Sequence, residues 1–283
     1  MLKTTLFSLI CIVSPSSYSF EIYQFLNWHY LKMPDGEVKY SKKVRDYDKN
    51  LSSIGMKKMN VIYSVQILTD NRPDYKKIKK IVEATKIDPY TPICFDIEIG
   101  VANKPETNLP VILGALNIYH KIGGKAPIGV YGVLPQRTPN KIISKKQRND
   151  FILLNKKYEE IAKNVDFISP TLYFYSLQNM DIWKNKAQFN MQEAKKYANQ
   201  YNLKIYPFIS LSNWEIRNKK FFVTPISESN MDMALAFLES QGANGVVLWE
   251  SGSSRQANDE MPAVFDMNKD SFKSVVNILN RNK

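Results

Sequence analysis

Short apolar runs alternate with segments of helical periodicity along the chain after residue 20. Apolar, β-rich runs predict strands at 21–28, 60–65, 93–99, 128–133, 167–173, 205–211 and 245–249. Periodic segments between them predict helices at 74–84, 109–122, 145–162, 191–201, 229–241 and 270–280. The polar stretch 30–56 is expected to be a long first loop. Strands that alternate with helices predict an α/β fold with parallel pairing and covered faces.

Two architectures fit this alternation, a closed barrel or an open doubly wound sheet. An open sheet usually has a glycine-rich turn after its first strand, and residues 26–30 (LNWHY) contain no glycine. Polar and aromatic residues instead follow several predicted strands, and in a barrel these strand ends converge on one mouth. We therefore expect a single TIM-like (β/α) barrel with seven strands.

Two acids, Asp96 and Glu98, stand two positions apart in an apolar run. Side chains at this spacing point to the same face of a strand. Burying two carboxyl groups there costs several kcal/mol unless the site uses them. Neighbouring carboxylates also separate their pKa values, so that one stays protonated while the other is ionised, as glycoside hydrolysis requires. The alternative is an acidic pair that caps a helix or binds lysine.

The first 19 residues resemble a secretory signal. Lys3 precedes an apolar core at 6–13, and Ser17 and Ser19 provide small residues before a cleavage site after Ser19. The apolar run is too short to span a bilayer. We expect residues 1–19 to be removed and residues 20–283 to form one secreted or periplasmic barrel domain. Cys94 is then the single cysteine, expected to be a core residue rather than half of a disulfide.

The formal net charge of +12 indicates attraction to polyanions, which include anionic glycans, nucleic acid and anionic membranes. No nucleic-acid motif, glycine-rich phosphate loop or cluster of zinc ligands accompanies this charge. The two histidines, His29 and His120, leave little material for a metal site or a Ser-His-Asp triad. We expect no metal, no cofactor, no nucleic-acid partner and no membrane insertion after signal cleavage, and the oligomeric state stays open.

Aromatic residues at the predicted strand ends suit a sugar site, because their faces stack on pyranose rings. Tyr173 and Trp249 have this placement most clearly, while Trp28, Tyr131 and Trp214 are intermediate. Trp183 has no such placement and is interpreted as a packing residue. His29 is interpreted as structural.

Several motifs together resemble the hyaluronidase family of glycoside hydrolases. They are residues 95–98 (FDIE), 169–173 (SPTLY), 242–251 (GANGVVLWES) and, more loosely, 130–135 (VYGVLP). The resemblance covers residues 20 to 255, and chitinase-like barrels share the Asp-x-Glu strand. It implies a distorted seven-stranded barrel and substrate-assisted, retaining hydrolysis beside an N-acetylhexosamine.

The resemblance also implies roles for single residues. Glu98 would protonate the glycosidic oxygen, and Asp96 would orient the substrate acetamido group, whose oxygen attacks the anomeric carbon. Tyr173 would bind that acetamido group, Trp249 would form a wall of the subsite, and Ser251 would lie at its rim.

Departures from the family argue against hyaluronan as the specific substrate. The chain lacks the disulfides of animal members, has Ile99-Gly100 where they have a basic and aromatic stretch, and has Glu250 in place of a glycine. Peptidoglycan or another N-acetylhexosamine polymer is the alternative, and the polysaccharide can be anionic or neutral. Two other functions stay open, a non-catalytic glycan-binding barrel and an envelope protein that binds polyanions.

Overall fold

Parallel strands form the centre of the protein. The computed structural model describes residues 20–27, 29–33, 35–41, 47–175, 179–258 and 260–281. A four-stranded sheet has the order β12-β15-β1-β4, and a five-stranded sheet has the order β11-β10-β9-β8-β5. Their bounds are β1 Glu21–Leu26, β4 Lys57–Lys58, β5 Asn60–Tyr63, β8 Ile93–Asp96, β9 Ile128–Tyr131, β10 Phe167–Ser169, β11 Lys204–Ile205, β12 Phe208–Ile209 and β15 Gly245–Glu250.

The two sheets join into a ring because two segments contribute to both. Segment 57–63 pairs with β1 through β4 and with β8 through β5. Segment 204–209 pairs with β10 through β11 and with β15 through β12. Pro207, which has no N–H to donate, lies at the second interruption. The described part of the chain thus forms a (β/α) barrel of seven parallel segments, distorted where the ladder is interrupted, as the sequence predicted.

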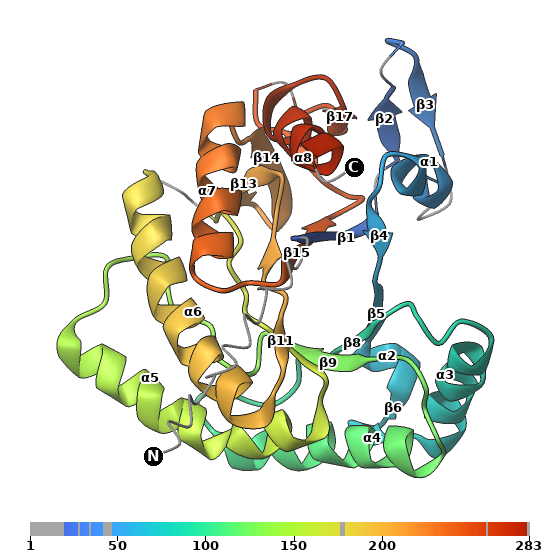
Figure 1. The fold of residues 1–283 in the computed structure, drawn as a ribbon, viewed down its shortest axis with the longest axis vertical. Coiled ribbons are helices and arrows are strands. Elements are labelled where there is room, and N and C mark those ends of the chain that lie inside the picture. Colours follow the sequence, from blue (N-terminus) through green and yellow to red (C-terminus); the bar gives the residue numbers. More distant parts are fainter. Residues whose placement is uncertain are drawn as a thin grey trace, which may run out of the picture.

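Helices cover the outside of the ring, and each follows a strand (Figure 1). The main helices are α3 Tyr75–Ile87, α4 Leu109–Lys121, α5 Lys145–Lys157, α6 Met180–Tyr201, α7 Glu228–Ser240 and α8 Asp270–Arg281. Shorter pieces are α1 Asp48–Ser53, α2 Ser64–Ile67 and the 3₁₀ turns Pro105–Thr107 and Glu159–Asn164. Asn179 begins α6, its side chain accepting from the N–H of Ile182 at 3.0 Å.

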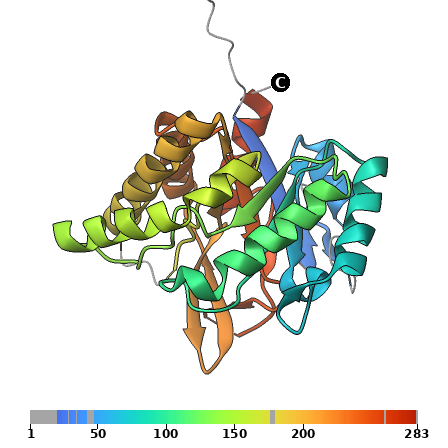
Figure 2. The same cartoon turned by 90° about the horizontal axis from the view of Figure 1, so that it is seen from below.

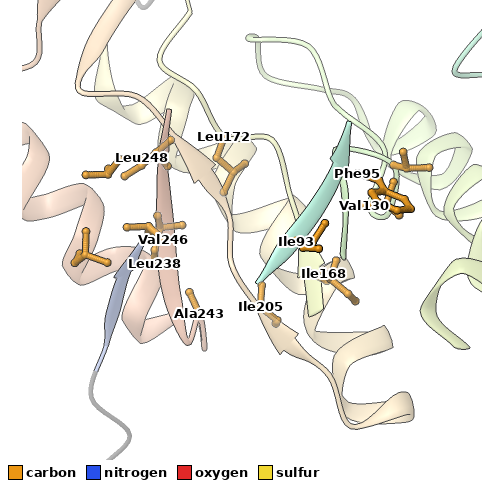
Figure 3. Close-up of a cluster of buried hydrophobic side chains, with 14 of the residues drawn as sticks. Ile93, Phe95, Val130, Ile168, Leu172, Ile205, Leu238, Ala243, Val246 and Leu248 are labelled. Carbon is orange, nitrogen blue, oxygen red and sulfur yellow. The ribbon is translucent and has the colours of Figure 1, made fainter. Parts of the chain in front are cut away.

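Strand alternation divides the core into two clusters. Outward residues of the strands, such as Ile93, Phe95, Val246 and Leu248, pack under the helices (Figure 3). Residues of opposite parity fill the barrel interior, namely Tyr23, Phe25, Val61, Cys94, Phe167, Phe208 and Val247. The buried thiol of Cys94 is therefore a core group, as expected. Parity along each strand decides which side chains can reach the barrel mouth.

Smaller sheets follow the carboxyl ends of the barrel strands. The antiparallel hairpin of β13 Ser212–Arg217 and β14 Lys220–Pro225, extended by β16 Arg255–Gln256, projects from the barrel (Figure 2). β2 Tyr30–Lys32, β3 Val38–Tyr40 and β17 Val264–Asp266 form another sheet. β6 Leu68–Thr69 and β7 Arg72–Pro73 form a third. The expectation of an irregular loop at 30–56 was wrong, because β2, β3 and α1 lie within it.

Helix α6 begins eleven residues before the predicted start. Its first half buries polar side chains, which interrupts the apolar periodicity: Lys186 is 4% exposed and donates to Asn140 Oδ1 at 2.6 Å. Asn190 donates to Thr138 Oγ1 at 2.7 Å. Trp183 packs in this half, and its indole N–H donates to the carbonyl of Leu172 at 2.7 Å, so its structural interpretation is confirmed.

The predicted segment boundaries also needed correction at several places. Most strands stop sooner than predicted; the one predicted over 93–99 ends at Asp96. The helix predicted over 145–162 divides at Tyr158 into α5 and a 3₁₀ turn. The predicted signal and its cleavage site lie outside the described residues. In the ranges that are described, no helix combines the length and the apolar character needed to cross a membrane.

Gly129 provides a test of packing inside the barrel. A Cβ at this position would lie 2.3 Å from the Phe167 ring, so we expect Gly129→Ala to destabilise the protein by about 1–3 kcal/mol. Urea unfolding followed by circular dichroism measures this loss. Adding Phe167→Leu, which shortens the opposing side chain, should recover part of the stability. Equal stability of wild type and Gly129→Ala would contradict the packing described here.

Candidate active site

A cavity of about 520 Å³ opens at the carboxyl ends of the barrel strands. The inward side chains at these ends surround it, together with the hairpin β13–β14. Its lining consists of Val61, Tyr63, Ser64, Val65, Asp96, Glu98, Tyr131, Arg137, Tyr173, Tyr175, Phe208, Trp214, Ile216, Phe221 and Trp249. Six of the eight residues expected at the site, Asp96, Glu98, Tyr131, Tyr173, Trp214 and Trp249, thus lie in one cavity.

The acidic pair reaches the cavity through the parity of β8. Cys94 points into the barrel interior, and Asp96 and Glu98 follow at steps of two residues, so all three face inward. Asp96 is the last residue of the strand, whereas Glu98 lies beyond it and is exposed. The pair therefore combines a half-buried carboxyl group with one that solvent reaches.

Asp96 has an environment that favours its protonated form. Burial, with the Glu98 carboxylate adding repulsion, raises the pKa of Asp96 to about 7. Its Oδ1 atom is buried and has no hydrogen-bond partner among the described residues. An unpaired buried polar atom costs about 1–3 kcal/mol, and a donor on a bound ligand would remove this cost. In the free protein, Asp96 therefore keeps its proton up to nearly neutral pH.

Aromatic rings form a continuous wall on the other side of the cavity. Tyr173 stacks on Trp214 with ring centroids 4.7 Å apart, and Trp214 contacts Trp249 edge-on at 4.9 Å. Tyr131 lies 6.2 Å from Tyr173. Burial raises the pKa of the Tyr173 hydroxyl well above its usual value, so this group stays a neutral donor. The wall provides flat apolar faces with polar tips, which suits stacking on a sugar ring.

Glu250 supports this wall from behind. Its carboxyl group is fully buried and accepts from the N–H of Leu211 at 2.8 Å and from Trp214 Nε1 at 3.1 Å. Burial raises the pKa of Glu250 to about 8, although these hydrogen bonds act against the shift. On β15 it has the outward parity of Val246 and Leu248, so it lies outside the cavity that Trp249 lines. Glu250 therefore orients Trp214 and does not place its charge in the cavity.

Four polar residues of the cavity, Tyr63, Ser64, Arg137 and Tyr175, were not among the predicted site residues. Tyr63 ends β5, and its hydroxyl accepts from Trp249 Nε1 at 3.2 Å. It stands near the end of a predicted strand, so the rule that identified Tyr173 was sufficient to find it. Arg137 lies six residues beyond β9 in a loop. No local pattern in the sequence marks it, because the path of the loop brings it to the cavity.

Among the described residues expected at the site, Ser251 alone does not line it. Ser251 follows the end of β15 in a turn, and its hydroxyl lies 2.9 Å from Ser253 Oγ instead of at the cavity. Trp28 is outside the described residues. His29 Nδ1 lies 2.8 Å from the carbonyl of Ser41, which agrees with a structural role. Across the described residues, no three His, Cys, Asp or Glu side chains lie close enough together to hold a metal ion.

Comparison with known proteins relates this chain to solved structures only. No protein-family model matches the chain, and no curated protein matches it. Bee venom hyaluronidase superposes with a TM-score of 0.57 at 12% identity, covering 82% of this chain and 91% of that one. The endo-1,4-β-D-mannanase of Thermotoga petrophila superposes with a TM-score of 0.51 at 11% identity, covering 94% of this chain and 91% of that one. The spore cortex-lytic enzyme SleL of Bacillus megaterium superposes with a TM-score of 0.50 at 10% identity, covering 85% of this chain and 72% of that one.

The chain has the fold of barrel glycoside hydrolases. At these identities the likeness extends to the fold and does not identify a substrate. The resemblance to hyaluronidases in particular stays a prediction, because enzymes with other substrates superpose nearly as well. The side chains of the cavity, rather than the fold, therefore determine the chemistry that is possible here.

The buried Glu250 carboxyl group predicts a pH dependence of stability. Its pKa is raised from 4.5 to about 8 in the folded protein, so the folded state holds a proton that the unfolded state releases. The contribution of the protonated Glu250 carboxyl group to stability is complete below pH 4.5 and is lost as the pH rises through about 8. We expect the free energy of unfolding to fall by on the order of 2–4 kcal/mol between pH 5 and pH 8 from this group.

Urea unfolding at several pH values measures this slope. Glu250→Gln should flatten it, whereas Glu239→Gln, which changes an exposed acid on α7, should leave it unchanged. An identical slope in Glu250→Gln and wild type would show that Glu250 does not hold the proton. Asp96, whose pKa is also raised, contributes a slope of the same sign in all three proteins.

Proposed function

We propose that this protein is an exported glycoside hydrolase that cleaves a polysaccharide beside an N-acetylhexosamine, by substrate-assisted hydrolysis with retention. The observation that carries the proposal is the half-buried carboxyl group of Asp96, whose Oδ1 atom has no partner among the described residues, beside Glu98 and opposite an aromatic wall. The fold agrees with it, because barrel enzymes place their chemistry at the carboxyl ends of the strands. The presence of both Asp96 and Glu98 argues against a binding barrel without catalysis.

The proposed reaction divides the work between the two acids. Glu98 donates a proton to the glycosidic oxygen, and the acetamido oxygen of the substrate forms a bond to the anomeric carbon as the glycosidic bond breaks. Asp96 accepts a hydrogen bond from the acetamido N–H and balances the positive charge of the oxazolinium intermediate. Water then attacks the anomeric carbon, gives its proton to Glu98 and restores the acetamido group. Two inversions at the same carbon give retention.

The pKa of Asp96 decides where the proton must move. The reaction needs a neutral Glu98 and an ionised Asp96, so the pair has to hold one proton in total. In the free protein Asp96 is the group whose pKa is raised, to about 7. When the acetamido N–H donates to Asp96 it favours the ionised form of this carboxyl group, and the proton is then available to Glu98. Substrate binding would thus prepare the acid.

The aromatic wall would hold the sugar in place for this attack. Trp249 and Trp214 present ring faces and edges, and Tyr173, whose neutral hydroxyl donates a hydrogen bond to Tyr131, would contact the acetamido group. Such contacts align the attacking oxygen with the anomeric carbon, and alignment of reacting atoms contributes several kcal/mol. The assay that tests the proposal is release of reducing ends from hyaluronan, chondroitin, chitin oligomers and peptidoglycan.

Glu98→Gln is expected to remove most turnover while the fold is kept. Glutamine has nearly the same shape but no acidic proton, and general acids contribute about 10²- to 10⁴-fold to rates. The measurement is kcat on the best polymer of the panel, with circular dichroism to check folding. Turnover close to that of wild type in purified Glu98→Gln would rule out Glu98 as the acid.

Asp96→Asn should lower kcat more than it changes KM, because an amide still binds but cannot balance the oxazolinium charge. The wild-type profile of kcat/KM against pH should fall on the alkaline side near pH 7, where the pair loses its last proton. In Asp96→Asn this limb near pH 7 should be lost, since the variant lacks the carboxyl group that has the raised pKa. If Asp96→Asn only increases KM and the alkaline side of the pH profile still falls near pH 7, Asp96 is a binding residue.

A further inference from the structure

A second cavity, of about 510 Å³, adjoins the catalytic one. Phe221 lines both cavities and lies 6.2 Å from the Trp214 ring, so the aromatic wall continues from one into the other. Loops and hairpins at the carboxyl ends of the strands form it. The lining consists of His29, Tyr30, Tyr40, Lys219, Lys220, Phe221, Gly252, Ser253, Ser254, Arg255 and Pro262.

The second cavity is positively charged. Lys219, Lys220 and Arg255 line it and are cations. Among the described residues that line this cavity there is no Asp or Glu. Within the described part of the chain, neither lysine has an ion-pair partner. Arg255 donates to the backbone carbonyl of Glu260 at 2.8 Å, which leaves its charge without a carboxylate. Most of the other lysines in the described ranges lie on helices, whereas these three cations line one concave site.

Two further features of the cavity point to a saccharide. Ser254 is 4% exposed, and its hydroxyl has no hydrogen-bond partner among the described residues, which leaves it free to bond to a ligand group. Tyr30 and Tyr40 pack with ring centroids 4.8 Å apart, and Tyr40 is 55% exposed. An exposed tyrosine ring beside an unsatisfied hydroxyl matches the apolar face and the polar edge of a sugar.

We propose that the second cavity is a subsite for an acidic sugar unit, bearing a carboxylate or a sulfate, of the same glycan chain that enters the catalytic cavity. The proposal rests on the proposed function and names the class of its substrate, an anionic rather than a neutral polymer. The shared wall at Phe221 lets one chain occupy both cavities. The cations of the hairpin and of the segment at Arg255 then bind the acidic group beyond the unit held at Asp96.

Lys219 and Lys220 can be replaced by neutral residues without disturbing the backbone of the hairpin. Asn218 and Lys219 form the two-residue turn between β13 and β14, with φ of +48° and +62°. Asparagine adopts this left-handed conformation more readily than most residues, so Lys219→Asn keeps the turn. Lys220→Gln retains a long polar side chain on β14. The double variant Lys219→Asn/Lys220→Gln therefore removes two charges while the hairpin is preserved.

The experiment measures oligosaccharide binding by calorimetry in a Glu98→Gln background, where turnover is blocked. Probes are hyaluronan oligosaccharides, which carry carboxylates, chondroitin sulfate oligosaccharides, which add sulfates, neutral chitin oligosaccharides, and polyphosphate. The matched control, Lys79→Gln/Lys80→Gln, removes two exposed charges from α3. We expect the hairpin variant to lose about tenfold in affinity for at least one acidic glycan. Chitin binding should be unchanged, and the control variant should match its parent.

Loss of affinity for hyaluronan would identify the carboxylate, and loss for chondroitin sulfate alone would identify the sulfate. Three results would overturn the proposal: equal acidic-glycan affinity in the hairpin variant and its parent, an equal loss for chitin, or polyphosphate binding as tight as that of the acidic glycans with the same dependence on the lysines. The proposed function fails separately. If wild type cleaves none of the polymers but the lysines still select acidic glycans, the subsite stands and the hydrolase assignment does not.

Discussion

The site depends on the parity of one strand, β8. Its outward residues, Ile93 and Phe95, are anchored in the apolar layer under the helices, so the register of the strand is strongly fixed. Cys94 and Asp96 must then face inward, and a shift by one residue would move the carboxyl group into the hydrophobic layer. The packing of the core therefore holds an acid at the barrel mouth, where its Oδ1 atom has no hydrogen-bond partner among the described residues. Burial and repulsion by Glu98 raise its pKa as a consequence.

The aromatic wall extends this arrangement to the rest of the mouth. Trp249 and Glu250 are neighbours on β15 with opposite parity, so one lines the cavity while the other lies in the buried layer. The Glu250 carboxyl group reaches the Trp214 indole from that layer and fixes the ring that stacks on Tyr173. A residue that departs from the hyaluronidase pattern in sequence thus has a structural role here, and the departure is compatible with a sugar site.

Much of the barrel could be predicted from the sequence because its signals are local. Short apolar strands, helix periodicity and polar residues at strand ends predicted the ring and brought six of the eight expected residues into one cavity. Helix α6 started earlier than predicted because Lys186 and Asn190 are buried through hydrogen bonds, which periodicity does not detect. Arg137 and the hairpin lysines reach the mouth through loop paths, and such paths depend on tertiary packing. Ser251 was misplaced because the turn after β15 satisfies its hydroxyl locally.

The most direct test of the account is whether the acetamido group of the substrate is the nucleophile. The measurement compares kcat/KM for oligosaccharides of the best polymer whose N-acetyl groups carry zero, one, two or three fluorine atoms. Fluorine withdraws electrons from the attacking oxygen, so the account predicts a steep, progressive fall in kcat/KM along the series. Equal rates for all four substrates would show that the acetamido oxygen does not attack, and would contradict the assignment of Asp96 and Glu98 to substrate-assisted hydrolysis.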